Sequence, residues 1–304
     1  LNFESEIELP MLNIISKPST IDVTIQFGEV PERLENPQDT RVLYDAKPNH
    51  FLMWFKFNPV RFYVTNGNQI TIAHLLSHQS GIPDYQFVVE EAYEQGETLD
   101  EDDIYEVIAE MILENGLNFT PGSGKQYSNS NFLIAALLVQ ELSQMSYHEY
   151  MQQKIFIPLG MTDTYKGNNI IDTNTHAEGY ENGNINSTYP MTIAFGVGDF
   201  SSTPNNMETW TNAVKSNWFK EAEKAEIFAQ NVPSGFVDFG LGWFTTQEGD
   251  TTMYWHGGDI NGYWSMIGFI PEYDATIVLL SNEQDDTSTQ RNTIIQHLLT
   301  NVFN

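Results

Sequence analysis

Hydrophobic and polar residues repeat with two different periods along this chain. Near its start, residues 21–27 place an apolar side chain at every second position, which is the period of a half-buried strand. Short β-branched and aromatic runs appear again at residues 253–255, 265–270 and 275–281, between turns that contain Gly, Pro or Asp. These runs predict successive antiparallel strands of a meander.

The middle of the chain has helical periodicity instead. Residues 70–77 predict a short apolar helix that ends at the Ser-Gly-Ile-Pro segment 80–83. Residues 99–115 start with four acidic positions, which suit the positive end of a helix dipole. Residues 131–145 predict a strongly apolar helix, and residues 288–303 predict a closing amphipathic one.

This order predicts an α+β fold in which both termini build one sheet and a helical region is inserted between them. We expect residues 1–43 and 235–304 to form the sheet region. Residues 44–234 are expected to form the mainly helical region, and the two together to make one unit.

Composition narrows the range of partners. The 304 residues are 40% hydrophobic, which is enough for a sizeable core, and 41 acidic against 13 basic side chains give a formal charge of −28. Nucleic acid is excluded as a partner because few basic residues are available to bind phosphates. The acidic surface has two interpretations: solubility in a salty or alkaline medium, or adaptation to a cationic substrate.

Cysteine is absent, so there is no disulfide, thiol nucleophile or cysteine-based metal site. No stretch approaches the ~20 apolar residues of a membrane span. The chain opens at Leu1 without a basic and then apolar leader, so we expect that any signal peptide has been removed or never existed.

Two short motifs carry candidate chemistry. Tyr127-Ser128-Asn129 follows a Pro-Gly turn and precedes a predicted helix, which would present the Tyr127 phenol to a cleft. A tyrosine has an ordinary pKa of about 10, but a lysine ammonium beside it favours the anion, which can then accept a proton. Asn129 offers a donor and acceptors to a substrate amide. The alternative is a helix N-cap in which Ser128 or Asn129 caps and Tyr127 packs.

The second motif, His256-Gly257-Gly258-Asp259, ends a predicted strand. Glycines on a strand let a ligand backbone approach closely, and such an edge pairs with an extended peptide. His256 would then interact with a carboxylate or balance charge. The alternative is a β-bulge or hairpin whose glycines serve geometry.

Four further segments, taken in chain order together with these two motifs, carry a resemblance to a known family. They are residues 70–83 (ITIAHLLSHQSGIP), 154–164 (KIFIPLGMTDT), 196–203 (GVGDFSST) and 256–282. The chain closely resembles the penicillin-recognising serine hydrolases, which include class C β-lactamases, D,D-peptidases and β-lactamase-like esterases. The resemblance covers roughly residues 20 to 300. It implies a β-lactamase/transpeptidase-like fold, with an antiparallel sheet flanked by helices, an all-helical region and the site between them.

Three motifs carry the chemistry of that family. In Ser-x-x-Lys, the serine attacks a carbonyl and the lysine helps to activate it. Tyr-x-Asn, matched by Tyr127 and Asn129, supplies a proton-shuttling tyrosine. Lys- or His-x-Gly, matched by His256 and Gly258, lies on the substrate-binding strand, and the N–H of Asp259 would complete the oxyanion hole. The resemblance implies acyl transfer through a covalent acyl-enzyme, without metal or other cofactor.

The first of these motifs is altered, because no serine stands three residues before a lysine. Residues 36–42 (NPQDTRV) fit the family's lead-in, and counting on from them puts Tyr44 at the nucleophile position and Lys47 at the lysine position. The family would then place a small-residue helix where residues 50–64 are rich in aromatics and contain Pro59. Three interpretations stay open: a local frame error, a diverged non-hydrolytic relative, or a working enzyme that uses Tyr44 or another hydroxyl.

The remaining polar residues of the matched segments are expected to serve structure. They are Ser77, Ser80, Ser128, His74, His78 and Asp199.

Two functions therefore compete. The first is a β-lactamase-like serine hydrolase of the D-alanyl-D-alanine carboxypeptidase, β-lactamase or esterase type. The second is a catalytically silent protein of the same fold that binds cell-wall peptide or β-lactam-like ligands. Either takes a small molecule or peptide, and the family and composition together suggest an extracytoplasmic location, secreted or periplasmic.

Overall fold

The computed structural model describes most of the chain from His50 onward. The described residues are 50–54, 61–65, 69–97, 99, 104, 107–108, 111–112, 114–167, 176–186, 191–216, 218–229, 238–284 and 287–303. Tyr44, Lys47 and the predicted strand 21–27 lie outside them. The expected division into regions 1–43, 44–234 and 235–304 therefore stays a prediction.

A five-stranded antiparallel sheet forms the carboxy-terminal part, in the order β11-β10-β9-β8-β7. The predicted meander is confirmed. Its strands are β7 (Asp238–Phe239), β8 (Phe244–Glu248), β9 (Thr251–Ile260), β10 (Tyr263–Ile270) and β11 (Ala275–Ser281). β9 is longer than expected, and the 256–259 motif lies inside it rather than at its end.

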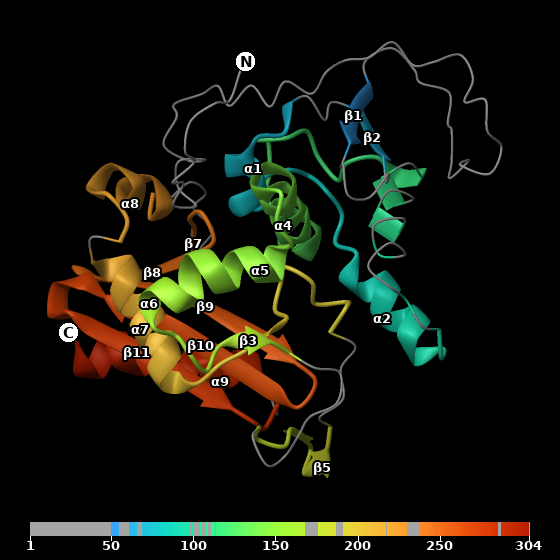
Figure 1. The fold of residues 1–304 in the computed structure, drawn as a ribbon. Helices are drawn as coiled ribbons and strands as arrows, with labels where there is room; N and C mark the ends of the chain where they lie inside the picture. Colours follow the sequence, from blue (N-terminus) through green and yellow to red (C-terminus); the bar gives the residue numbers. More distant parts are fainter. Residues whose placement is uncertain are drawn as a thin grey trace, which may run out of the picture.

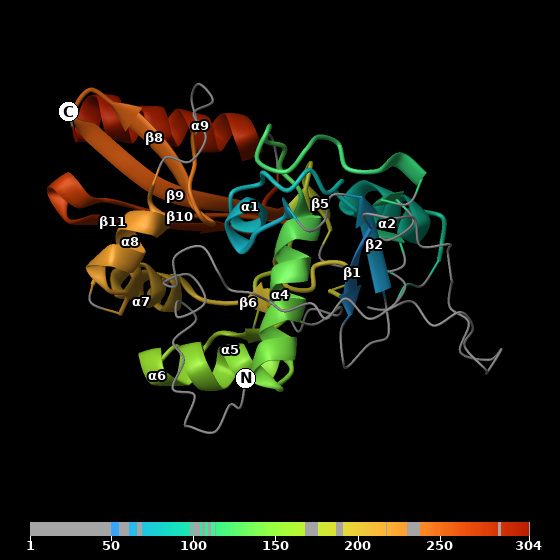
Figure 2. The same cartoon turned by 90° about the horizontal axis from the view of Figure 1, so that it is seen from above.

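Helices cover both faces of this sheet, as Figure 2 shows. α9 (Thr287–His297) and the π-helical turn η6 (Leu298–Val302) lie on one face, where Ile295 and Leu299 pack against Met253 and Met266. α7 (Pro204–Lys215) and α8 (Glu221–Ile227) cover the other face. Successive side chains of a strand point to opposite faces, so alternate residues of β9 and β10 enter the two cores.

The helical region is organised around α4 (Asn129–Ser143), which begins two residues before the predicted helix 131–145. Leu133, Ile134 and Leu137 of α4 are buried against α1 (Ile72–Leu76) and α2 (Gln86–Glu94). Buried Ile104, Ile108 and Ile112 complete this core, as the spacing within 99–115 predicts. Thr71 caps α1 by accepting a hydrogen bond from the His74 N–H at 3.1 Å.

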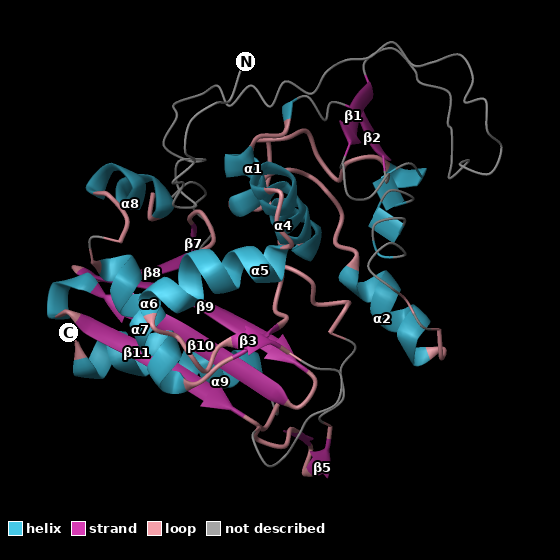
Figure 3. Ribbon diagram, in the orientation of Figure 1, coloured by secondary structure: helices cyan, strands magenta, loops and turns pink. Residues whose placement is uncertain are grey.

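Shorter elements connect the two parts, and Figure 3 shows the long loops between them. The connecting helices are α5 (Tyr147–Met151), η4 (Gln152–Phe156) and α6 (Ile157–Leu159), whereas the short helix η5 (Pro271–Tyr273) joins β10 to β11 within the sheet. The strand pairs are β3 (Tyr165–Lys166) with β6 (Phe200–Ser201), and β4 (Tyr180–Glu181) with β5 (Asn184–Ile185).

β1 (His50–Trp54) and β2 (Arg61–Thr65) form an antiparallel hairpin on the side of the helical region away from the main sheet (Figure 1). The family resemblance implies a small-residue helix here, and the structure has strands instead. Aromatic and β-branched residues dominate both segments, and such residues favour extended backbone.

The sheet meets the helical region where the β7–β8 turn docks on α1. The Gly242 N–H donates to the Leu76 carbonyl at 2.9 Å. This contact places β8 and β9 next to the loop that precedes α4. Among the described helices, none combines the length and apolar character needed to cross a bilayer.

Candidate functional site

The loop before α4 presents Tyr127 and Asn129. Ser128 occupies the N-cap position with extended backbone angles (φ −154°, ψ 120°), but its hydroxyl makes no capping hydrogen bond. Its N–H donates instead to His78 Nδ1 at 3.1 Å. Asn129 is therefore the first helical residue, and its side chain is not used to cap the helix.

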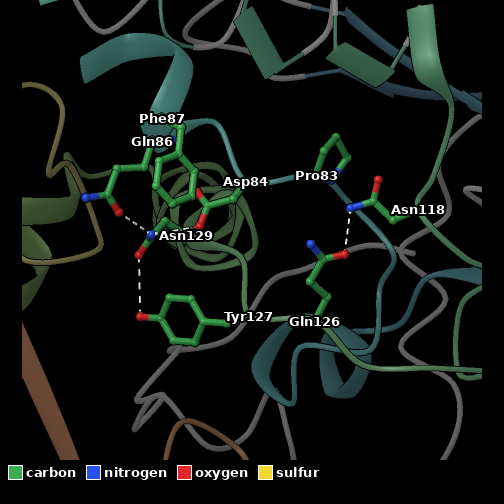
Figure 4. A pocket seen from close by; sticks show the side chains of 8 residues that line it. All are labelled: Pro83, Asp84, Gln86, Phe87, Asn118, Gln126, Tyr127 and Asn129. Atoms are coloured by element: carbon green, nitrogen blue, oxygen red, sulfur yellow. Dashed lines mark hydrogen bonds between the residues drawn. The ribbon is translucent and has the colours of Figure 1, made fainter. Parts of the chain in front are cut away.

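The Asn129 amide is held by two acceptors (Figure 4). Its Nδ2 donates to Asp84 Oδ2 at 3.0 Å and to Gln86 Oε1 at 2.5 Å. Its Oδ1 faces the Tyr127 hydroxyl at 3.4 Å, a long and weak hydrogen bond. The orientation of the amide is thus fixed, and Oδ1 retains capacity to accept from a ligand N–H.

His78 packs against the Tyr127 ring. The two rings stack with centroids 4.3 Å apart and planes at 28°. His78 is 2% exposed, and burial together with nearby His256 lowers its pKa to about 3. The imidazole is therefore neutral at pH 7, and its Nδ1 accepts the Ser128 N–H. This agrees with the structural role expected for His78.

The protonation of Tyr127 is set by its neighbours. Although 42% of this residue is exposed, burial of its hydroxyl and the negative charges of Asp84 and Asp259 raise its pKa to about 12, against a smaller opposite effect of Arg291. Within these surroundings Tyr127 is a protonated phenol at neutral pH, suited to donating a proton. The expected phenolate requires a cation such as Lys47, which lies outside the described residues.

On the other side of the site, His256 lies on β9 and stacks on Phe244 of β8 at 4.5 Å and 16°. Burial lowers its pKa to about 4, and the Arg291 charge acts in the same direction. His256 is therefore neutral at pH 7. It can exchange hydrogen bonds with a ligand but does not supply the positive charge considered for it.

The stretch from His256 onward has an open edge among the described residues. β8 pairs with β9 only as far as Phe244 opposite Trp255, whereas β10 continues to pair as far as Tyr263 opposite Ile260. Residues 256–260 thus have a partner strand on one side only. An extended ligand backbone has the geometry to pair with the other side.

Arg291 of α9 lies against this stretch, and no local sequence signal indicates it. Its Nη2 binds Asp259 Oδ2 at 2.5 Å, and its Nη1 donates to the carbonyls of Gly258 and Ser265, both at 3.4 Å. A Cβ at position 257 would lie 2.9 Å from Arg291 Cδ and Nη1. Gly257 therefore makes room for the guanidinium.

A line of aromatic rings joins the two sides of the site. His78 contacts Phe239 of β7 at 5.4 Å, Phe239 contacts Phe244 at 5.1 Å, and Tyr127 lies 6.5 Å from Phe244. Phe244 thus contacts both Tyr127 and His256. The two sequence motifs, more than 120 residues apart, are brought to one place.

A pocket of about 480 Å³ opens beside Tyr127 on the helical side (Figure 4). Its lining combines a carboxylate, three polar amides besides Asn129, and apolar and aromatic rings. The lining residues are Pro83, Asp84, Gln86, Phe87, Asn118, Gln126, Tyr127 and Asn129. The described residues hold no group of three or more His, Asp or Glu side chains arranged to bind a metal.

Comparison with known proteins decides the family. The profile of the family described as Beta-lactamase matches residues 43–300, most of the chain. The chain belongs to the Beta-lactamase family. Because the match begins at residue 43, it spans Tyr44 and Lys47. The family assignment therefore confirms the resemblance to penicillin-recognising serine hydrolases.

Curated relatives include Penicillin-binding protein 4* of Bacillus subtilis (strain 168), 25% identical over 244 residues, which are 73% of this chain and 53% of that protein. Protein flp of Staphylococcus aureus (strain MRSA252) is 24% identical over 283 residues, 89% of this chain and 53% of the relative. The chain thus spans about half the length of these relatives.

Solved structures share the fold. D-amino acid amidase from Ochrobactrum anthropi SV3, complexed with D-phenylalanine, has a TM-score of 0.61 at 23% identity, covering 76% of this chain and 77% of that one. A D-stereospecific amidohydrolase from Streptomyces sp. has a TM-score of 0.66 at 23% identity, covering 78% and 74%. The β-lactamase/transpeptidase-like fold expected from the sequence is confirmed.

In this Beta-lactamase family member, the structure brings Tyr127 and Asn129 together with the β9 stretch 256–259. Their roles in catalysis or binding stay predictions. Asp84, Phe244 and Arg291 join them, and sequence reasoning missed all three. Asp84 follows the Ser-Gly-Ile-Pro segment and so had a nearby signal, whereas Phe244 and Arg291 had none.

Proposed function

We propose that this protein is an acyl-transferring hydrolase, with a small amide, peptide, ester or β-lactam as substrate. The observation that carries this proposal is the convergence of Tyr127 and Asn129 with the open-edged stretch 256–259 around Phe244. The substrate would lie between them, paired with β9.

Each side of this cleft has a role in the proposed reaction. The Asn129 Oδ1 accepts an N–H of the acyl part, and the Asp259 N–H joins the nucleophile's own N–H in the oxyanion hole. A base, which we assign to Lys47 below, takes the proton of the nucleophile as its oxygen adds to the carbonyl carbon. Tyr127, a protonated phenol with a pKa of about 12, donates its own proton to the leaving group as the bond to the carbonyl carbon breaks, and it recovers a proton from that base. Water then adds to the acyl-enzyme and releases the acid and the free nucleophile hydroxyl.

Tyr44 is the proposed nucleophile and Lys47 its activating base, by their positions after the 36–42 segment. A tyrosyl ester forms less readily than a seryl ester because the phenol is bulkier and a better leaving group. It also breaks down faster. We therefore expect slow acylation to limit turnover.

The relatives support a small acyl substrate. One is a penicillin-binding protein, and one solved structure is a D-amino acid amidase bound to D-phenylalanine. We propose that peptides or amides of D-amino acids belong among the candidates, beside β-lactams and esters. A secreted or periplasmic location, where such cell-wall compounds occur, is part of the same proposal.

A second candidate function rests on Tyr44 itself. With a tyrosine where the family has its serine, the same cleft would bind cell-wall peptide or a β-lactam-like ligand without acyl transfer. Loss of a catalytic nucleophile leaves only about 10³–10⁴-fold rate enhancement over water. In this case the ligand would bind reversibly and leave unchanged.

Covalent labelling separates the two functions. The protein is incubated with a fluorophosphonate probe and with a fluorescent penicillin, and mass spectrometry locates any acylated residue. The hydrolase predicts one labelled hydroxyl. Tyr127→Phe should slow labelling by the penicillin roughly 10²-fold, because the proton donor for the leaving nitrogen is lost while the ring still stacks. Tyr165→Phe, an exposed tyrosine on β3, is the matched control. Reversible binding without any label would favour the silent binding protein.

A further inference from the structure

Asp84 places a carboxylate in the wall of the pocket beside Tyr127. Its Oδ1 accepts the Gln86 N–H at 3.1 Å, and its Oδ2 accepts Asn129 Nδ2 at 3.0 Å. The backbone of Asn129 also forms a hydrogen bond with Asp84. A carboxylate offers about four lone-pair sites, so Asp84 keeps capacity for a further donor. In the part of the chain that the structure describes, no lysine, arginine or histidine forms an ion pair with Asp84.

Among the residues that the structure describes, the other charges around the cleft do not offset this carboxylate. Arg291 is already paired with Asp259, while burial keeps His78 and His256 neutral. The Lys125 ammonium lies over the Phe239 ring at 4.2 Å, outside the pocket lining. Burial and Glu90 raise the pKa of Asp84, although hydrogen bonds from Gln86 and Asn129 partly oppose them. A cation beside Asp84 would reverse this unfavourable burial of charge.

Part of the pocket lining is apolar. Phe87, at the start of α2, is 77% exposed and lines the pocket with Pro83. An exposed aromatic ring beside a half-buried carboxylate suits a ligand with an apolar group close to a positive charge.

We propose that this pocket receives a protonated amine, and that the preferred substrates are amides or esters whose acyl part carries a primary amino group near the scissile carbonyl. One side-chain amide, that of Asn129, separates the Asp84 carboxylate from the Tyr127 hydroxyl. An amino group within a few bonds of the carbonyl therefore reaches Asp84 while the carbonyl lies near Tyr127.

The acidic composition was interpreted above as a possible adaptation to a cationic substrate, and Asp84 would be the place where such a substrate binds. The described lining of the pocket contains no lysine, arginine or histidine. A carboxylate-bearing ligand such as a penicillin would therefore be repelled by Asp84 with no positive side chain in this lining to offset the repulsion. The net charge of −28 acts in the same direction at long range, since it attracts cations and repels anions.

Binding is tested with phenylalaninol and N-acetylphenylalaninol, which share an apolar group and differ in the charged amine. In both compounds an alcohol replaces the carbonyl group next to the amino-bearing carbon. Neither therefore has the amide or ester bond that the proposed reaction cleaves. By calorimetry at low salt we expect phenylalaninol to bind about tenfold more tightly, a typical gain for a charge-assisted contact. Equal binding, or no binding of phenylalaninol at millimolar concentration, overturns the inference.

Two variants assign the preference to Asp84. Asp84→Asn should remove the preference for the amine, and Asp84→Glu should retain much of it. Glu94→Gln, which removes an exposed carboxylate at the other end of α2, should leave it unchanged. An unchanged preference in Asp84→Asn overturns the inference. Should that variant not fold, loss of the wild-type preference on adding salt is the second criterion, because salt screens the ion pair.

Turnover is measured in a separate experiment from binding. The substrate preference rests on the proposed hydrolase function, whereas binding of the amine by Asp84 does not. Phenylalanine p-nitroanilide is compared with its N-acetyl derivative. Cleavage of the free amine in preference is expected. If neither is cleaved and no probe labels the protein while phenylalaninol still binds through Asp84, the hydrolase fails and the amine site stands.

Discussion

At the scale of single residues, the neighbours of each polar group in the cleft determine its protonation. Tyr127 lies near two carboxylates and stays a phenol, with a pKa of about 12. His78 and His256 are removed from water and stay neutral, with pKa values of about 3 and about 4. A site with two buried neutral histidines is sensitive to acid, because protonation requires charge in an apolar environment.

The acid sensitivity of stability follows from these values. Both histidines have folded-state pKa values below the ordinary 6.5, so the unfolded chain binds protons more readily. Their contribution is fully present above pH 6.5 and is lost as pH falls from 6.5 through about 4 to about 3. We expect His78→Asn to reduce the pH dependence of the unfolding free energy between pH 6.5 and 5 by about 1 kcal/mol per pH unit.

Asparagine is the suitable replacement because its Oδ1 can accept the Ser128 N–H and because it tolerates the left-handed backbone of His78 (φ 57°). Urea denaturation at several pH values gives the slope. His297→Asn, at an exposed position of α9, should leave the slope as it is. If the unfolding free energies of wild type and His78→Asn change with pH in parallel, the lowered pKa of His78 is contradicted.

At the scale of elements, strand β9 both packs against α9 and has an edge to which a ligand could bind. Its α9 face packs Met253 and Trp255 into a core, and Gly257 on the same face leaves space for Arg291. Beyond Trp255 one edge has no partner strand among the described residues, because the pairing with β8 stops there. The strand is therefore held firmly by α9 and β10 at the place where a ligand would pair.

Gly257→Ala tests this packing. The added Cβ would meet Arg291 atoms at 2.9 Å, and Arg291 is held by Asp259 and two carbonyls, so α9 must shift away from the strand. We expect a loss of about 1–3 kcal/mol in unfolding free energy, measured by urea denaturation. Gly198→Ala, where a Cβ would meet nothing within 4 Å, is the control. Equal stability of both variants would show that Arg291 moves without cost.

At the scale of the whole molecule, an excess of 28 negative charges acts on folding as well as on ligand steering. Like charges repel one another more in the compact state than in the expanded one, and salt screens this repulsion. The hydrophobic clusters that the described residues form must therefore maintain the fold against this long-range repulsion.

Salt should accordingly stabilise the protein. We expect the melting temperature to rise by several degrees between about 0.02 and 0.5 M sodium chloride, since the Debye length falls from over 20 Å to under 5 Å. Differential scanning calorimetry at constant pH measures this shift. A melting temperature that is constant or falls with salt would mean that local ion pairs such as Arg291–Asp259 outweigh the net repulsion.

The elements that sequence periodicity predicts are those whose side chains face a core on a regular period. β10 and β11 were predicted within a residue or two because they carry such patterns. The β1–β2 hairpin was not, since the family resemblance implies a helix there while the residues favour strands. The motifs containing Tyr127 and His256 were identified, but their contact through Phe244 has no local signal.

By itself, the sequence determined the strand meander, the apolar helix α4, the family and the absence of a Ser-x-x-Lys motif. These depend on local periodicity and on residues close together in the chain. Only the tertiary structure decided that Asp84 lies beside Asn129, 45 positions away, and that Arg291 pairs with Asp259, 32 positions away. Burial and charge, which set the pKa of Tyr127, His78 and His256, arise from such distant contacts, so the chemistry of the cleft was decided by packing.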